Sequence, residues 1–112
     1  MELIRKFISG KLFERQWASL DLSDDELKEL QSILLDDPKK GNVIQGTGRL
    51  RKMRFSYGNR GTSHCARVCY VDFEKEDTIF LIMIFAKKEM ENLTASDKNA
   101  LKKKIDMIEK KL

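Results

Sequence analysis

Three strand-length segments follow one another in the second half of the chain, with only turn-forming residues between them. They span 49–55, 65–73 and 78–85, and the last two are rich in β-branched and aromatic residues. The charged turn at 74–77 joins the second to the third, and two glycines mark the connection between the first and the second. Strands joined by short turns pair antiparallel, so these residues predict a small antiparallel sheet.

Helical patterns flank the predicted sheet on both sides. Before it, Ser23 and Glu26 have the spacing of a capping box, and apolar residues then recur at helical spacing until Pro38 ends the pattern. After it, Thr94 caps a helix whose apolar residues form one stripe to bury against the sheet. The stripe consists of Leu101, Ile105, Ile108 and Leu112.

A short strand at 3–8 and a helix at 11–20 are predicted near the N-terminus. With 112 residues, 41% of them hydrophobic, the chain is long enough for one domain and too short for two. We therefore expect one α+β domain over 1–112, with N-terminal helices and a C-terminal helix packed on the small antiparallel sheet. No apolar run approaches the roughly 18 residues of a membrane span, so we expect a cytoplasmic protein without a membrane partner.

Charge is distributed unevenly along the chain. Residues 38–71 include no aspartate or glutamate, whereas acidic residues dominate 21–37. A basic stretch without internal neutralisation can hold phosphates at several points, so it predicts a surface for a polyanion, with nucleic acid as the first candidate. Its cations are Lys39, Lys40, Arg49, Arg51, Lys52, Arg54, Arg60 and Arg67.

Two of these cations are predicted to lie side by side. Met53 and Phe55 share one face of the first sheet strand and are expected in the core, which places Lys52 and Arg54 together on the opposite face. Neighbouring cations repel each other, so the arrangement favours an anion between them. The alternative interpretation is an ordinary solvated strand face.

Arg67 lies at the start of a strand whose nearest residues, Ala66, Val68, Cys69, Tyr70 and Val71, are uncharged. An arginine there needs a partner, and its planar guanidinium suits a phosphate. The alternative is a structural ion pair with Asp72 or with the acidic helix. Lys87 and Lys88 end the last strand, where side chains can project towards a cleft or simply be solvated.

The other reactive residues indicate neither a metal site nor a disulfide. His64 is the only histidine, so two histidines cannot share acid and base roles. Cys65 and Cys69, if on one strand, lie roughly 13 Å apart, too far for a disulfide. With His64 they lack a fourth ligand and zinc-site spacing, so we expect no metal and no cofactor. Any catalysis must therefore depend mainly on cations.

Three segments of the chain together resemble a known family. They read DPKKGNVIQGTGRLRKMR at 37–54, ARVCY at 66–70 and FAKKEMENLT at 85–94. In these segments the chain resembles the HigB branch of the RelE-like toxins, from about residue 23 to the C-terminus. The resemblance implies a RelE-like fold and a toxin of a type II toxin–antitoxin module. Such toxins cut messenger RNA, usually in the ribosomal A site.

The resemblance also implies roles for single residues. It places Lys52 and Arg54 at the paired basic positions, Arg67 at the arginine that contacts the scissile phosphate, and Lys88 at the basic position after the last long strand. The family uses the 2′-hydroxyl of the RNA as nucleophile, so the protein orients the RNA and stabilises the growing negative charge. The further cations expected to bind RNA are Arg49, Arg51, Arg60, Lys87, Lys39 and Lys40.

The chain departs from the family where a proton must be moved. Some members carry a tyrosine near the start of the last helix, where this chain has Asn92, Leu93 and Thr94. The loop before Arg67 often carries a lysine or arginine with paired glycines in the family, whereas this chain has Thr62, Ser63, His64 and Cys65 there. His64 in that loop is therefore a candidate substitute acid or base.

Two functions from different classes follow. The first is a metal-independent, ribosome-dependent endoribonuclease that inhibits translation and is neutralised by a cognate antitoxin. By analogy with the HigB branch, that antitoxin is a HigA-like helix-turn-helix protein through which the complex binds operator DNA. The second is a non-catalytic nucleic-acid-binding module, such as a decayed toxin that acts as a co-repressor. The missing tyrosine favours the second function, and the set Lys52, Arg54, Arg67 and Lys88 favours the first.

Overall fold

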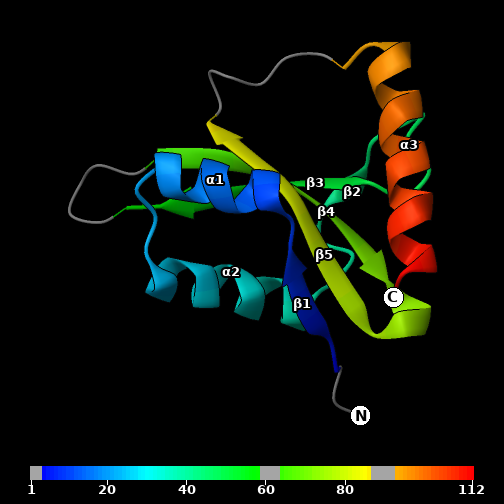
Figure 1. Cartoon of the computed structure of the whole chain (residues 1–112). Helices are drawn as coiled ribbons and strands as arrows, with labels where there is room; N and C mark the ends of the chain where they lie inside the picture. The colour runs from blue at the N-terminus through cyan, green and yellow to red at the C-terminus, as the bar shows by residue number, and fades with distance from the viewer. Residues whose placement is uncertain (1–3, 59–63, 87–92) are drawn as a thin grey trace.

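A five-stranded sheet with three helices forms the computed structural model, which describes residues 4–58, 64–86 and 93–112 (Figure 1). The strands lie in the order β1-β5-β4-β3-β2. The elements, in chain order, are β1 Lys6–Ser9, α1 Lys11–Ser19, α2 Asp24–Asp36, β2 Asn42–Val43, β3 Arg51–Tyr57, β4 His64–Phe73, the short 3₁₀ helix Glu74–Glu76, β5 Thr78–Ala86 and α3 Ala95–Lys110. The predicted α+β class and the order of the main elements are confirmed.

The antiparallel pairing predicted for the three main strands is confirmed, and the sheet as a whole is mixed. β2, β3, β4 and β5 pair antiparallel, but β1 pairs parallel with β5, in a register that places Lys6 beside Thr78. Two helices and three strands separate β1 from its partner, and so long a connection allows a parallel pair where a hairpin does not. Beyond the end of β1, Gln16 of α1 accepts a hydrogen bond from the backbone N–H of Ile84 at 2.9 Å, which covers more of the β5 edge.

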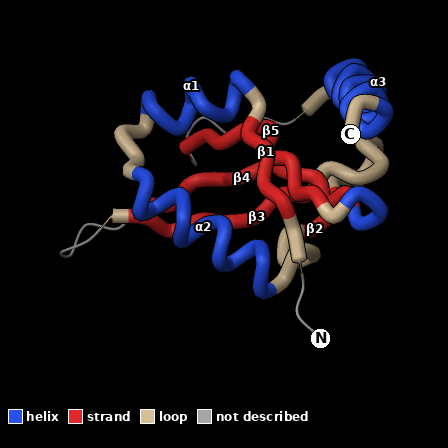
Figure 2. Tube along the Cα trace, turned by 60° about the horizontal axis from the view of Figure 1, so that its bottom comes forward, coloured by secondary structure: helices blue, strands red, loops and turns tan. Residues whose placement is uncertain are grey.

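The two faces of the sheet bury separate apolar clusters. α1 and α2 cover one face, and α3 stands apart from them in both views (Figure 2). The cluster beneath α1 and α2 includes Phe13, Trp17, Leu30, Leu34, Met53, Phe55, Val68 and Tyr70. The cluster beneath α3 includes Leu50, Cys69, Val71, Phe73, Ile82 and Ile105. Residues of β4 alternate between the clusters, as the period of a strand requires.

Both predicted helix caps are present. The Ser23 hydroxyl accepts from the N–H of Glu26 at 3.2 Å, and the Glu26 carboxylate accepts from the N–H of Ser23 at 2.9 Å. Thr94 and Asp97 form the same reciprocal pair at the start of α3, with both distances 3.1 Å. The predicted stripe of α3 is wrong at its last member, because the helix ends at Lys110 and Leu112 is 41% exposed.

Among the described residues, no helix has the length and apolar character needed to cross a membrane.

Candidate functional site

Three cations gather on the sheet face that α1 and α2 do not cover. Arg54 on β3 lies directly opposite Arg67 on β4, and Lys52 lies opposite Cys69. Met53 and Phe55 are buried on the other face, so the predicted placement of Lys52 and Arg54 is confirmed. We call Lys52, Arg54 and Arg67 the cationic cluster. Two arginines at directly opposed positions repel each other, so the cluster is suited to hold an anion.

Arg67 is buried within this cluster. Only 8% of its surface is exposed, whereas Arg54 is exposed and Lys52 half-buried. Within the part of the chain that the structure describes, Arg67 forms no ion pair; one guanidinium nitrogen, Nη1, donates to the Cys65 sulfur at 3.2 Å. Burying a charge without a counter-ion is costly, and none is present among the described residues, so the position suits an anionic ligand.

The alternative ion pair between Arg67 and Asp72 is wrong. Asp72 lies on the other face of the sheet and accepts from Arg5 at 2.8 Å, with Lys39 at 3.5 Å. The acidic helix α2 also lies on that opposite face. The two residues are separated by an odd number of positions on one strand, so their side chains diverge.

Cys69 shows that the sheet surface next to the cationic cluster is apolar. The residue is 2% exposed, and burial raises the pKa of its thiol to about 12, although the charge of nearby Lys52 acts in the opposite direction. Phe85 and Met83 of β5 continue the rows that contain Arg67 and Cys69. Charge is therefore presented on an apolar surface, where electrostatic interactions are less screened than in water.

Other predicted RNA-binding cations are engaged within the fold. Arg49 contacts Asp106 and Glu109 of α3, both at 2.9 Å, and its guanidinium lies 5.2 Å from the centre of the Phe73 ring. These contacts hold α3 against the loop before β3. They also raise the pKa of Arg49, chiefly through the hydrogen bond to Glu109. RNA binding by Arg49 stays a prediction, in competition with a structural role.

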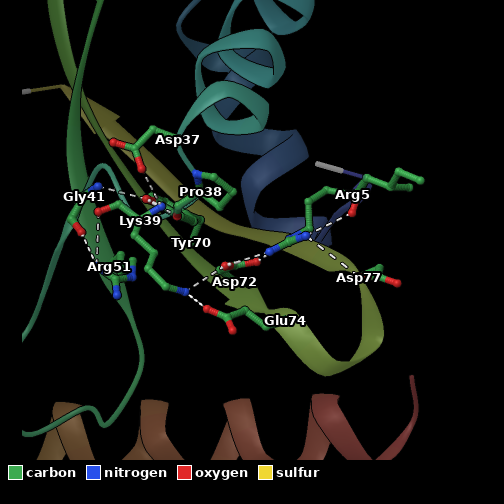
Figure 3. A network of polar contacts seen from close by, with 11 residues as sticks. Arg5, Asp37, Pro38, Lys39, Gly41, Arg51, Tyr70, Asp72, Glu74 and Asp77 are labelled. Atoms are coloured by element: carbon green, nitrogen blue, oxygen red, sulfur yellow. Dashed lines mark hydrogen bonds and ion pairs between the residues drawn. The ribbon is translucent and has the colours of Figure 1, made fainter. Parts of the chain in front are cut away.

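Lys39 and Arg51 belong to a polar network around the loop after α2 (Figure 3). Lys39 forms ion pairs with Asp72 and Glu74, and Arg51 donates to the backbone carbonyls of Lys39 and Gly41 at 3.3 and 2.7 Å. Both side chains lie away from the cationic cluster. Lys40 is exposed in the same loop. The predicted sites Arg60, Lys87 and Lys88 lie outside the described residues.

Tyr70 fixes that loop and was not identified from the sequence. Its buried hydroxyl donates to the carbonyl of Pro38 and accepts from the N–H of Gly41, both at 2.9 Å (Figure 3). A Cβ atom on Gly41 would lie 2.9 Å from the carbonyl oxygen of Lys52, so the loop runs directly against β3. Tyr70 thereby supports the strand that carries Lys52 and Arg54.

His64 lies on the opposite face from the cationic cluster. It pairs with Tyr57 across β3 and β4, and the two rings stack at 5.5 Å between centroids. Tyr57 in turn stacks on Phe55, which belongs to the core beneath α1 and α2. The structure therefore does not bring His64 together with Arg67, and its acid or base role lacks geometric support.

Neither cysteine is in a disulfide, as expected from their positions on one strand. Across residues 4–58, 64–86 and 93–112, no group of three or more histidine, cysteine, aspartate or glutamate side chains is arranged to hold a metal ion.

Comparison with solved structures relates the fold to a toxin. No family model matches the chain. The structure of the E. coli toxin RelE in the free state, determined for a variant with two arginines replaced by alanine, superposes with a TM-score of 0.55. The match has 18% sequence identity and covers 91% of this chain and 97% of that one. The chain therefore has a RelE-like fold, over nearly its whole length.

Proposed function

We propose that this protein is a toxin of a type II toxin–antitoxin module that cleaves messenger RNA on the ribosome. The observation that carries the proposal is the buried Arg67, which faces Arg54 and has no acidic partner among the described residues. The RelE-like fold supports it. The resemblance of segments 37–54, 66–70 and 85–94 to HigB toxins supports it as well. We further propose that the protein acts in the cytoplasm and that a HigA-like antitoxin neutralises it and links it to operator DNA.

The cationic cluster suits cleavage by the RNA itself. The 2′-oxygen attacks the adjacent phosphorus, its proton passes to a base, and the bond from phosphorus to the 5′-oxygen breaks as that oxygen gains a proton. The products are a cyclic phosphate and a 5′-hydroxyl. Negative charge grows on the phosphate oxygens, where the fork of Arg67 can donate to two of them. Arg54 and Lys52 would hold the same or a neighbouring phosphate.

The experiment is cleavage of message on programmed ribosomes by the parent protein and by Arg67→Ala. We expect the substitution to lower the cleavage rate on the order of 10²–10³-fold, about 3–4 kcal/mol, which is the usual effect of removing one donor to a transition-state oxyanion. Arg67→Lys should recover only part of the rate, because a point charge cannot replace the bidentate fork. Arg15→Ala, which removes an exposed cation from α1, is the matched control and should cleave like the parent.

Thermal unfolding of the same variants separates catalysis from folding. A structural role for Arg67 predicts a lower melting temperature, with activity following the folded fraction. If Arg67→Ala melts like the parent and still cuts at the parent rate, the assignment of Arg67 is refuted.

One observation favours the non-catalytic alternative. On β3, β4 and β5, the positions that share a face with Arg67 include no carboxylate and no imidazole, so these strands offer the cluster no ordinary general base. A co-repressor that binds nucleic acid needs no such group. Induction in cells decides between the two functions: growth arrest with cut message supports the toxin, whereas operator binding with the antitoxin and no arrest supports the co-repressor.

A further inference from the structure

The sulfur of Cys65 and the guanidinium of Arg67 are in direct contact. The two residues are separated by one position on β4, so their side chains share a face, and Nη1 of Arg67 lies 3.2 Å from Sγ. Cys65 is half-buried and Arg67 is 8% exposed. Among the described residues, this thiol is the only hydrogen-bond acceptor of Arg67.

Position along the strand does not by itself impose this contact. An arginine side chain can extend far beyond its own strand position, and Arg54 directly across the sheet repels it. Here the side chain instead turns back along β4 to the sulfur. The contact with Cys65 is therefore made by one orientation of a long side chain that has many.

The chemistry of the acceptor decides how many N–H donors and how much charge of Arg67 stay available to a ligand. A thiol is a neutral, weak acceptor, so it occupies one of the guanidinium N–H groups and leaves the positive charge uncompensated. A carboxylate in its place would form a bidentate ion pair and compete with phosphate for the same fork. Sulfur thus orients the cation without neutralising it.

We propose that Cys65 is a positioning residue that holds the Arg67 guanidinium in place for an RNA phosphate. The proposal rests on the proposed function of Arg67 and adds a residue that acts through it. A weak neutral contact at this position orders the guanidinium before RNA binds. This reduces the conformational entropy that the Arg67 side chain loses when it binds the phosphate.

The first test compares Cys65→Ala with Cys65→Ser in cleavage on ribosomes. Loss of one neutral hydrogen bond should lower kcat about tenfold, with KM within about twofold, because the contact matters for the geometry of the transition state. Serine retains an acceptor at the same place and should recover kcat to within about threefold of the parent. A purely structural role predicts instead that activity follows melting temperature in both variants.

The second test uses a pair of side chains of equal size. Cys65→Asp places a carboxylate beside Arg67, and Cys65→Asn places a neutral amide there. We expect Cys65→Asp to lose cleavage by about 10²-fold or more, as if the arginine charge were removed, while Cys65→Asn stays within about tenfold of the parent. Equal rates for the two variants would overturn the proposal.

A spectroscopic arm separates this proposal from the proposed function. In protein with ¹⁵N-labelled arginine, the Arg67 guanidinium should show restricted rotation, which Cys65→Ala abolishes and Cys65→Ser restores. If the parent protein cuts no message, the proposed function fails, and this measurement still reports whether Cys65 orients Arg67. Arg67 signals that are the same in the parent and in Cys65→Ala overturn the inference, whatever the cleavage result.

Discussion

Replacing Tyr70 by phenylalanine tests how the loop after α2 is held. The hydroxyl of Tyr70 is its only polar group, and burial raises the pKa of the phenol, so it remains a donor at neutral pH. Phenylalanine keeps the ring in the core and removes the bonds to Pro38 and Gly41. The perturbation is therefore confined to two hydrogen bonds.

The magnitude follows from what the deletion leaves behind. Pro38 and Gly41 are both buried, so one carbonyl and one N–H lose their partner without gaining water. Each unsatisfied buried group costs about 1–3 kcal/mol, which gives about 2–4 kcal/mol for the pair after partial relaxation. For a domain of this size that free energy corresponds to a fall in melting temperature of about 10–15 °C.

Urea unfolding provides the measurement, with the slope of free energy against urea checked for constancy. Lys39→Met is the control in the same network: its ammonium is largely exposed, and Asp72 keeps its bond to Arg5, so we expect less than about 1 kcal/mol. If Tyr70→Phe and Lys39→Met change the free energy of unfolding equally, the burial argument for Tyr70 is refuted.

Three further predictions concern caps, packing and pH. Ser23→Ala should lower the free energy of unfolding by about 1 kcal/mol, measured by urea titration, because α2 loses its cap. Gly41→Ala should destabilise the fold and weaken cleavage together, since its Cβ atom would meet the Lys52 carbonyl; unchanged melting would contradict the close approach. Burial raises the pKa of the Cys69 thiol from about 8.5 in the unfolded chain to about 12 in the fold. Burial of the neutral thiol therefore contributes its full stabilisation below about pH 8.5, and this contribution is lost as the pH rises towards 12. Stability curves should therefore decline less at alkaline pH in Cys69→Ala than in the parent.

Local rules predicted much of this structure from the sequence. The capping boxes at Ser23 and Thr94 depend on residues three positions apart, and the face shared by Lys52 and Arg54 follows from the alternation of a strand. The same alternation holds along β4. It separates Arg67 from Asp72, and equally from His64, because each is an odd number of positions away on one continuous strand.

Local rules do not predict contacts between segments that are far apart in the sequence. The parallel partner of β1 and the two-residue strand β2 are set by pairing with strands far along the chain. Arg49 looked like a ligand for phosphate because its partners, Asp106 and Glu109, lie on a helix near the other end of the sequence. The contact between Arg67 and Cys65 depends on the choice of one rotamer, which composition does not reveal.

The pairing of β1 with β5 has a consequence for the order of folding during synthesis. β1 leaves the ribosome well before its partner β5, and the ion-pair partner of Arg5, Asp72, lies 67 residues further along the chain. Contacts of such long range form slowly, so the nascent chain carries an unpaired strand until β5 has emerged. Phe85 of β5 also completes the row that contains Arg54 and Arg67. We therefore expect the cationic cluster to mature only after β5 has been made, which would delay any action on the ribosome that is synthesising the protein.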